Sequence, residues 1–163
     1  MHCDFRPMIE RDVPAVAALA EEGFAHFYQV DWRENARALY HAVLAARATV
    51  AVAESDEQVL GYCNLRSWPA GGWIDQIAVS KSKRRSGIGR TLLEAAMVAA
   101  RERGFWKVSL ITSEAEPEAL SFFQACGWEI VGRMRDEIRQ GVNGILLSRI
   151  VDYQLHPNRG SAQ

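Results

Sequence analysis

Cysteine is scarce in this sequence and is not arranged as in a metal site or a disulfide framework. The three cysteines, Cys3, Cys63 and Cys126, are odd in number and lie far apart along 163 residues. Zinc sites show closely spaced Cys and His pairs, and small secreted domains show even sets of cysteines. We therefore expect no metal, and we expect three free thiols in a reducing cytoplasm.

Long hydrophobic runs and an N-terminal secretion signal are also missing. No stretch approaches the roughly 18 apolar residues of a membrane-spanning helix. The first residues, Met1 to Arg6, contain no apolar core of a signal peptide. These absences predict a cytoplasmic protein that has no membrane partner.

The chain lacks an excess of charge of either sign. It has 19 Lys and Arg residues and 20 Asp and Glu residues, which give a net charge of -1. A globally basic nucleic-acid binder would look different, so nucleic acid is not an expected partner. The length and the 48% hydrophobic content predict one domain over residues 1–155 and a disordered tail over 156–163.

Positive charge is instead concentrated between a predicted strand and a predicted helix. The strand, Trp73 to Val79, is short, apolar and β-branched. The helix ends near Gly104 and has an apolar face at helical spacing. That face consists of Ile88, Leu92, Ala95, Ala96 and Ala99. The loop between strand and helix contains Lys81, Lys83, Arg84, Arg85, Gly87, Gly89 and Arg90.

This loop has the chemistry of an anion site. A helix N-terminus presents unpaired N–H groups and a partial positive charge, and glycine lets phosphates approach the backbone. A solvated basic turn in front of an ordinary helix is the alternative. The loop is not a P-loop, because no Gly-Lys-Ser/Thr follows, and the dinucleotide motif fails at Leu92.

Two motifs resemble those of one enzyme family. The residues from Arg84 to Gly89 fit the pattern Arg/Gln-x-x-Gly-x-Gly/Ala, after a strand that ends at Val79. This segment resembles the acyl-CoA loop of the GNAT superfamily of N-acetyltransferases. Residues 119–128 are similar to the later helix and turn of that family. The resemblance covers residues 5–153.

The predicted elements occur in the order β-α-α-β-β-β-α-β-α-β-β. The strands are expected at 5–9, 49–54, 59–68, 73–79, 106–112, 128–138 and 145–155, and the helices at 13–23, 34–46, 91–104 and 117–126. We expect Asp12 to cap the first helix and Asn143-Gly144 to form the turn of the last hairpin. The order predicts an α/β or α+β protein with a mixed, mostly antiparallel sheet flanked by helices, which resembles the GNAT fold.

The resemblance implies a reaction and a cofactor site. Family members transfer an acetyl group from acetyl-CoA to an amine by direct attack in a ternary complex. The residues implied to hold the pyrophosphate are Arg84, Arg85, Ser86, Gly87, Ile88, Gly89, Arg90 and Thr91. Those implied to lie beside the pantetheine and acetyl group are Ile77, Ala78 and Val79, whose backbone N–H groups polarise the thioester carbonyl. Lys81 or Lys83 is the candidate for the 3′-phosphate.

The amine must lose a proton, because alkyl amines are mostly protonated at neutral pH. Asp75 is the candidate base, since the family often places a carboxylate near this point of the strand. The alternative is that Asp75 faces solvent or pairs with an arginine. Further candidates are Glu114, Glu116 and His26.

The general acid and the acceptor pocket are less defined. Phe123 stands where the family usually has tyrosine and cannot donate a proton, which leaves the acid unassigned among Cys126, Tyr62 and Tyr153. The family builds its acceptor site from the first two helices and the last hairpin. The corresponding residues here are Phe24, Phe27, Tyr28, Trp32 and the 139–144 loop, and the aromatics are either pocket or core.

We therefore expect an acetyl-CoA-dependent N-acetyltransferase that acts on a primary amine of a small molecule. A protein N-terminal or lysine acetyltransferase is one alternative. A non-catalytic acyl-CoA-binding module is another, because Phe123 and Glu116 depart from the family pattern. The acceptor and the acyl-chain preference stay open, and so does the oligomeric state, with a homodimer as one alternative.

Overall fold

Helices and strands follow one another in the predicted order in a computed structural model, which describes residues 3–156. The strands are β1 (Asp4–Pro7), β2 (Ala48–Ser55), β3 (Gln58–Trp68), β4 (Gly71–Val79), β5 (Lys107–Ser113), β6 (Glu129–Arg139) and β7 (Val142–Ile150). The helices are α1 (Val13–Phe24), α2 (Trp32–Leu44), α3 (Ile88–Glu102) and α4 (Pro117–Ala125). Short 3-10 turns, η1 (Glu10–Asp12), η2 (Lys81–Lys83) and η3 (Tyr153–Leu155), complete the elements of this range.

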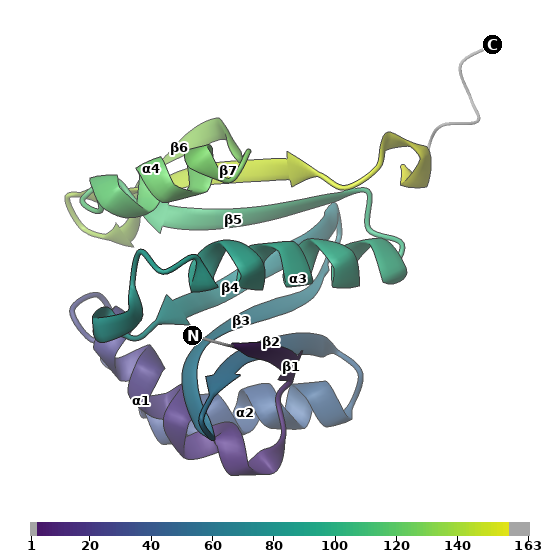
Figure 1. The fold of residues 1–163 in the computed structure, drawn as a ribbon. Coiled ribbons are helices and arrows are strands. Elements are labelled where there is room, and N and C mark those ends of the chain that lie inside the picture. The colour runs from purple at the N-terminus through teal and green to yellow at the C-terminus, as the bar shows by residue number, and fades with distance from the viewer. Residues whose placement is uncertain (1–2, 157–163) are drawn as a thin grey trace. The chain divides into compact units, whose positions relative to one another are not determined.

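The strands are hydrogen-bonded in the order β1-β2-β3-β4-β5-β7-β6 (Figure 1). The pairs β1–β2, β2–β3, β5–β7 and β6–β7 are antiparallel, whereas β4 and β5 are parallel. The predicted class, a mixed and mostly antiparallel sheet flanked by helices, is confirmed. Contacts divide the described residues into two compact units, 3–67 with 74–96 and 68–73 with 97–156, so that β4, α3 and the last residue of β3 are shared between them.

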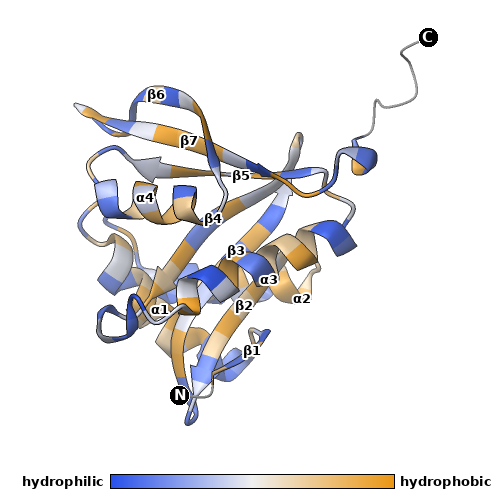
Figure 2. Cartoon of the chain, turned by 45° about the horizontal axis from the view of Figure 1, so that its top comes forward, coloured by the Kyte–Doolittle hydropathy of each residue, from blue (hydrophilic) through white to orange (hydrophobic). Residues whose placement is uncertain are grey.

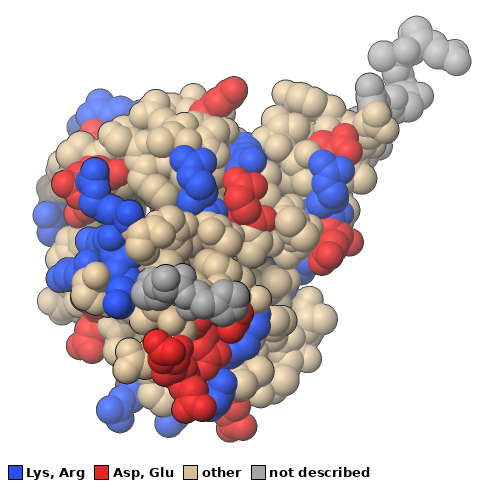
Figure 3. Space-filling model, in the orientation of Figure 1, with Lys and Arg blue, Asp and Glu red and all other residues tan. Residues whose placement is uncertain are grey.

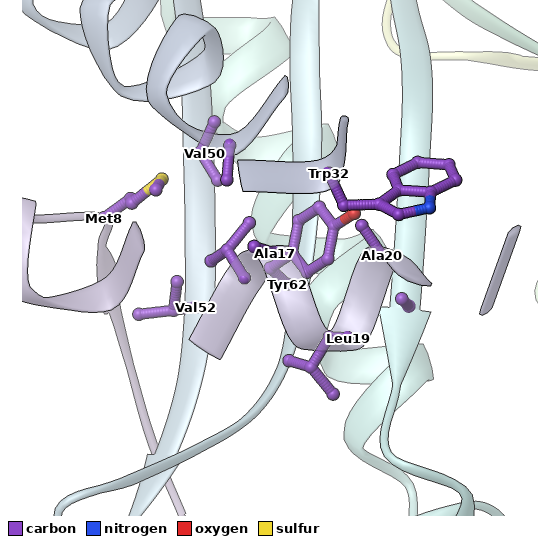
Figure 4. Packing of buried hydrophobic residues seen from close by; sticks show 11 residues of the cluster. Met8, Ala17, Leu19, Ala20, Trp32, Val50, Val52 and Tyr62 are labelled. Atoms are coloured by element: carbon purple, nitrogen blue, oxygen red, sulfur yellow. The ribbon is translucent and has the colours of Figure 1, made fainter. Parts of the chain in front are cut away.

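In the first unit, α1 and α2 cover one face of β2, β3 and β4. The buried cluster on this face consists of Met8, Val16, Ala17, Leu19, Ala20, Trp32, Ala36, Val50, Val52, Tyr62 and Ala78. Figure 4 shows Ala17 and Ala20 of α1 turned toward Tyr62 of β3, with Val50 and Val52 of β2 beside them. Alternate strand residues share a face, which is why Val50 and Val52 both reach the helices.

The beginning of α3 packs over the opposite face of β3. Gly61 precedes the helix-facing Tyr62 and therefore points to the other side of the strand. A Cβ at Gly61 would lie 3.1 Å from Leu92 Cδ1 of α3. Hydrophobic and hydrophilic residues alternate along α3 in Figure 2. Its buried side chains are Ile88, Leu92, Leu93, Ala96, Met97 and Ala100, whereas Ala95 and Ala99 of the predicted face are partly exposed.

The first helix begins without the predicted side-chain cap. Asp12 stands in the cap position but makes no cap hydrogen bond to α1. Its carboxylate, 2% exposed, accepts from Ile9 N at 2.8 Å and from two nitrogens of Arg6 at 2.7 and 2.9 Å. Burial raises the pKa of Asp12, but the hydrogen bonds from Arg6 and Ile9 and the nearby positive charges outweigh it and lower the pKa overall.

The second helix begins earlier than predicted because an aspartate caps it. Asp31 Oδ1 accepts from the N–H groups of Arg33 and Glu34 at 2.9 and 3.0 Å. These bonds satisfy two of the N–H groups that have no acceptor within a helix. The helix therefore starts at Trp32, two residues before the predicted start at residue 34.

In the second unit, β7 lies between β5 and β6, and α4 packs against β5 and β6. The predicted hairpin turn at Asn143-Gly144 is wrong. The turn is Gln140-Gly141, where Gly141 has φ of 81°, and Asn143 and Gly144 lie in β7. A Cβ at Gly144 would lie 2.9 Å from Ile111 Cγ2, so strand packing requires this glycine.

The last strand ends at Ile150 instead of the predicted Leu155. The N–H groups of Val151 and Asp152 donate to the carbonyl of Trp106, which turns the chain away from β5. Of the predicted tail, residues 157–163 lie outside the described residues. His156 is described, and its ring centroid lies 4.4 Å from that of Trp106 in an edge-on contact.

Over residues 3–156, none of the helices combines the length and the apolar character needed to cross a membrane. Within the same range, no three His, Cys, Asp or Glu side chains form a group that could hold a metal ion.

Candidate functional site

The connection between β4 and α3 is a basic loop whose shape is fixed by short hydrogen bonds. Ser80 N donates to Leu60 O at 2.8 Å, which joins the end of β4 to β3. Ser86 Oγ donates to Lys83 O at 2.6 Å and closes the loop on itself. Glu22 of α1 accepts from Lys81 N at 3.3 and 3.4 Å. These contacts join the loop to β3, to itself and to α1.

The loop enters α3 through a left-handed turn. Arg85 has φ of 63° and Gly87 has φ of 88°, and no atom lies within 4 Å of the place of a Cβ at Gly87. Because α3 begins at Ile88, the N–H groups of Ile88 and Gly89 have no acceptor within the helix. Gly87 therefore leaves open space beside N–H groups that can donate to an anion.

Positive side chains surround this open space. Lys81, Arg84, Arg85 and Arg90 are exposed, and Lys83 is half-buried. Figure 3 shows Lys and Arg side chains gathered over the connection between β4 and α3. The N-terminal end of the α3 dipole adds a partial positive charge. Backbone donors, open space and cations together are suited to binding an anion such as a diphosphate.

Gly61 is required where β3 passes under the loop. A Cβ at this position would lie 2.8 Å from Ala78 O and 3.2 Å from Val79 Cγ2, and the first of these is a backbone atom that cannot rotate away. Gly61 thus lets β3 approach the end of β4, where the candidate acetyl-binding residues Ile77, Ala78 and Val79 lie.

Replacement of Gly61 by alanine is expected to lower the free energy of unfolding by about 1–3 kcal/mol, as overpacking of a tight site does. The measurement is chemical denaturation of the variant and the unmodified protein. Gly132→Ala is the matched control, because a Cβ there has its nearest contact at 4.0 Å and fits. Equal stability of the two variants would contradict the close approach at Gly61.

Asp75, the candidate base, lies in an ion pair. Arg66 Nε donates to Asp75 Oδ2 at 2.7 Å, and Asn64 Nδ2 donates to the same oxygen at 3.4 Å. The two charged side chains are about one third exposed, at 36% for Arg66 and 32% for Asp75. The arginine pairing weighed as the alternative is thus present, and it keeps the carboxylate at a fixed place on β4.

A series of side-chain hydrogen bonds links β3 and β4 to α2. Tyr62 Oη donates to Gln76 Oε1 at 2.8 Å, and Gln76 Nε2 donates to Asn35 Oδ1 at 3.1 Å. Tyr62 is fully buried, and burial, with a smaller contribution from Cys63, raises the pKa of its hydroxyl. Tyr62 therefore stays protonated inside the first unit and is a structural donor.

Glu114, a further candidate base, is engaged by four hydrogen bonds. Arg133 donates to it through Nε and Nη2 at 3.0 and 2.6 Å, and Asn143 donates through its backbone N and Nδ2 at 3.1 and 2.6 Å. The hydrogen bonds from Arg133 and Asn143 hold the pKa of Glu114 below its usual range. Such a carboxylate is a weak base, and it ties the end of β5 to β6 and β7.

The remaining acid and base candidates, and Phe123 at the position of the family's tyrosine, lie in different settings. Phe123 and Cys126 are buried in the second unit, where Phe123 packs against Trp128 with ring centroids 6.2 Å apart. Tyr153 is 64% exposed and lies against Trp106. Glu116 occupies the cap position of α4 without a side-chain cap bond.

The aromatic residues expected to line an acceptor pocket divide into core and surface. Trp32 is 9% exposed, and Phe24 packs against it with ring centroids 6.2 Å apart. Tyr28 is 44% exposed, and the rings of Phe27 and His26 contact each other at a tilt of 42°, with centroids 3.9 Å apart. Trp32 and Phe24 therefore serve the core, whereas Tyr28 is exposed and Phe27 is half-buried in the first unit.

Four residues near the site escaped sequence analysis: Glu22, Gly61, Asn64 and Arg66. A signal existed for Gly61, since an isolated glycine inside a strand pattern suggests a close backbone approach. No sequence pattern indicated Glu22, Asn64 or Arg66, because each of them acts through a contact with a residue of another element.

Comparison with known proteins gives matches over most of the chain. The model of the Acetyltransferase (GNAT) family matches residues 14–128. Among curated proteins, N-acetyltransferase family 8 member 3 of Rattus norvegicus is 38% identical over 59 residues. This match spans 36% of the chain and 26% of that protein, so the chain corresponds to about a quarter of that relative.

Solved structures show the same fold at low identity. A putative acetyltransferase of the GNAT family from Desulfovibrio desulfuricans has a TM-score of 0.81 and 21% identity, over 92% of this chain and 99% of that one. An aminoglycoside 6′-N-acetyltransferase complexed with coenzyme A has a TM-score of 0.78 and 13% identity, over 91% of this chain and 97% of that one. With the family model matching residues 14–128 of 163, the chain belongs to the GNAT family of acetyltransferases.

Proposed function

We propose that the protein is an N-acetyltransferase that transfers an acetyl group from acetyl-CoA to a primary amine of a small molecule. The observation that carries the proposal is the anion site at the start of α3. There, Gly87 leaves open space beside the N–H groups of Ile88 and Gly89, and five cations lie on or next to the loop. A similar structure, the aminoglycoside 6′-N-acetyltransferase, was solved with coenzyme A.

In this proposal residues 84–91 hold the diphosphate, chiefly through backbone N–H groups, and Lys81 or Lys83 binds the 3′-phosphate. The hydroxyl of Thr91 donates to Gly87 O at 3.4 Å, so it supports the turn as well as lining the site. Bound acetyl-CoA supplies an activated acetyl group with a thiol as leaving group. Thiols titrate near about 8.5, so departure as a thiolate needs no strong acid. This suits a chain that has Phe123 at the position where the family usually has tyrosine.

The strand residues Ile77, Ala78 and Val79 would present their backbone to the pantetheine and the acetyl group. A fixed backbone N–H beside a carbonyl stabilises the negative charge that develops there. Asp75, two residues before Ile77, is the proposed base, and Arg66 Nε donates a hydrogen bond to its Oδ2 at 2.7 Å.

Thiol release tests the proposal. The full chain is incubated with acetyl-CoA and a chromogenic thiol reagent, against a panel of amino acids, polyamines, aminoglycosides and short peptides. We expect release that depends on a small amine and saturates with both substrates.

Release with peptides alone would instead favour a protein acetyltransferase. Acetyl-CoA that raises the melting temperature without any thiol release would favour the binding module. Absence of both effects would overturn the proposal.

A further inference from the structure

One buried polar atom of the first unit has no partner. Asn64 lies on β3, is 2% exposed, and its Oδ1 accepts no hydrogen bond. An unsatisfied buried oxygen costs on the order of 1–3 kcal/mol of stability. Most buried polar groups are paired, so an exception calls for a reason. An apolar residue would suit this position better if packing alone decided.

The orientation of the Asn64 amide follows from its neighbour. Nδ2 lies 3.4 Å from Asp75 Oδ2. A reversed amide would place its oxygen against the carboxylate, and two acceptors repel each other. The amide therefore turns its donor toward Asp75 and leaves Oδ1 in the interior. The amide orientation that leaves Oδ1 without a donor, at a cost in stability, is the one that lets Nδ2 contact the candidate base.

Both donors to Asp75 reach the same oxygen. Arg66 Nε and Asn64 Nδ2 contact Oδ2 from β3, while in residues 3–156 no group donates to Oδ1. Because Asp75 is 32% exposed, Oδ1 is the oxygen left for an outside donor. The two donors to Oδ2 fix the orientation of the carboxylate and therefore the direction in which Oδ1 points.

We propose that Asn64 is a positioning residue, which together with Arg66 holds Asp75 so that Oδ1 accepts a hydrogen from the acceptor amine. This inference rests on the proposed N-acetyltransferase function. The contacts run from Asn64 to Asp75 and from Asp75 to the amine, so Asn64 itself touches no reacting atom. The class of ligand follows from the chemistry: a carboxylate oxygen without a donor binds an N–H group.

The test replaces Asn64 by leucine, which has a similar size and no polar atoms. We expect a melting temperature that is unchanged or higher, because the unpaired oxygen is gone. We expect the stabilisation by acetyl-CoA to stay the same. The kcat/KM for the amine should fall by roughly tenfold to 10²-fold, as misplacement of a catalytic group does. Asn64→Ala, which adds no bulk, should lose the same activity.

A double-mutant cycle separates positioning from general damage. In an Asp75→Asn background, Asn64→Leu should reduce the residual kcat/KM no further, because the group that it positions is already gone. Cys63→Ala is the matched control, since Cys63 is the next residue on β3, is 1% exposed and points to the opposite face. It should lower the melting temperature and keep kcat/KM.

The failures are distinguishable. If the unmodified protein releases no thiol with any amine, the proposed function falls, and the role of Asn64 falls with it. If the unmodified protein is active and Asn64→Leu keeps full kcat/KM, or loses the same factor in both backgrounds, only the positioning role is overturned.

Discussion

Replacement of Gly87 by glutamate is expected to abolish acetyl-CoA binding by the full chain. Gly87 has φ of 88°, and a side chain in this left-handed region costs roughly 1–2 kcal/mol. The glutamate carboxylate would also occupy the open space beside the N–H groups of Ile88 and Gly89, where it repels a diphosphate and accepts their hydrogen bonds itself. The strain is present in the free and the bound protein alike, so it is the added carboxylate that should raise the Kd for acetyl-CoA, at least about 10²-fold, which corresponds to about 2.7 kcal/mol.

Calorimetric titration with acetyl-CoA measures this change, and thiol release measures its consequence. Gly104→Glu is the matched control, because Gly104 has φ of 73° and no atom lies within 4 Å of a Cβ there. Both variants therefore carry the same backbone strain and the same added charge. Binding by the Gly104 variant and none by the Gly87 variant is the expected pair of results. Unchanged binding by the Gly87 variant would show that acetyl-CoA is held elsewhere.

Gly87 was readable from the sequence because its surroundings are local. The end of β4, the loop and the first turn of α3 occupy one continuous segment, and each part has its own signal: β-branched residues, glycines and cations, and apolar residues at helical spacing. The order of elements was predictable for the same reason. Hydrophobic periodicity fixes the type of each element, and it does not depend on which other element covers the apolar face.

Hydrogen bonds and ion pairs between residues far apart in the chain could not be predicted from the sequence. Glu114 accepts hydrogen bonds from Arg133 and Asn143. Asp12 pairs with Arg6, which also pairs with Glu54. The sequence gives each of these residues several charged candidates at similar distance along the chain. Only the register of the strands decides among them, and register depends on tertiary packing. The same contacts explain why Asn143-Gly144, a good local turn signal, lies inside a strand.

Asp75, the candidate base, shows both what the sequence could predict and what it could not. The position of Asp75 just before Ile77 followed from the strand pattern. Its partner Arg66 lies on the neighbouring strand, where sequence reasoning considered some arginine but could not name one. Nothing in the sequence predicted a role for Asn64, because an asparagine within a strand is expected to face solvent, and its burial is known only from the structure.

Replacement of Arg6 by alanine is expected to lower the free energy of unfolding by about 3 kcal/mol at neutral pH. Removal of one partner of a buried ion pair leaves an unpaired charge, which costs about 3–5 kcal/mol, and the 23% exposure of Arg6 places this pair at the lower end. Asp12, 2% exposed, would keep its N–H bond from Ile9 and lose both guanidinium bonds. Chemical denaturation measures the change.

Arg11→Ala is the matched control on the same ion cluster. Arg11 is 60% exposed and contacts Glu54 at 3.0 Å, and exposed pairs contribute at most about 1 kcal/mol. A loss of stability in the Arg11 variant as large as in the Arg6 variant would show that burial of Asp12 is not the cause.

The pH dependence shows whether the carboxylates paired with Arg6, which are Asp12 and Glu54, carry the effect. The pKa of Asp12 in the folded protein is lowered, so its contribution is complete above the pKa of the unfolded chain, about 3.9, and is lost as pH falls through the folded pKa. Without Arg6, burial acts on Asp12 with less opposition and its pKa rises. The stability difference between the unmodified protein and Arg6→Ala should therefore be full at pH 7 and shrink as Asp12 becomes protonated in both. A difference that stays constant down to low pH would place the effect in the packing of the Arg6 side chain and not in its charge.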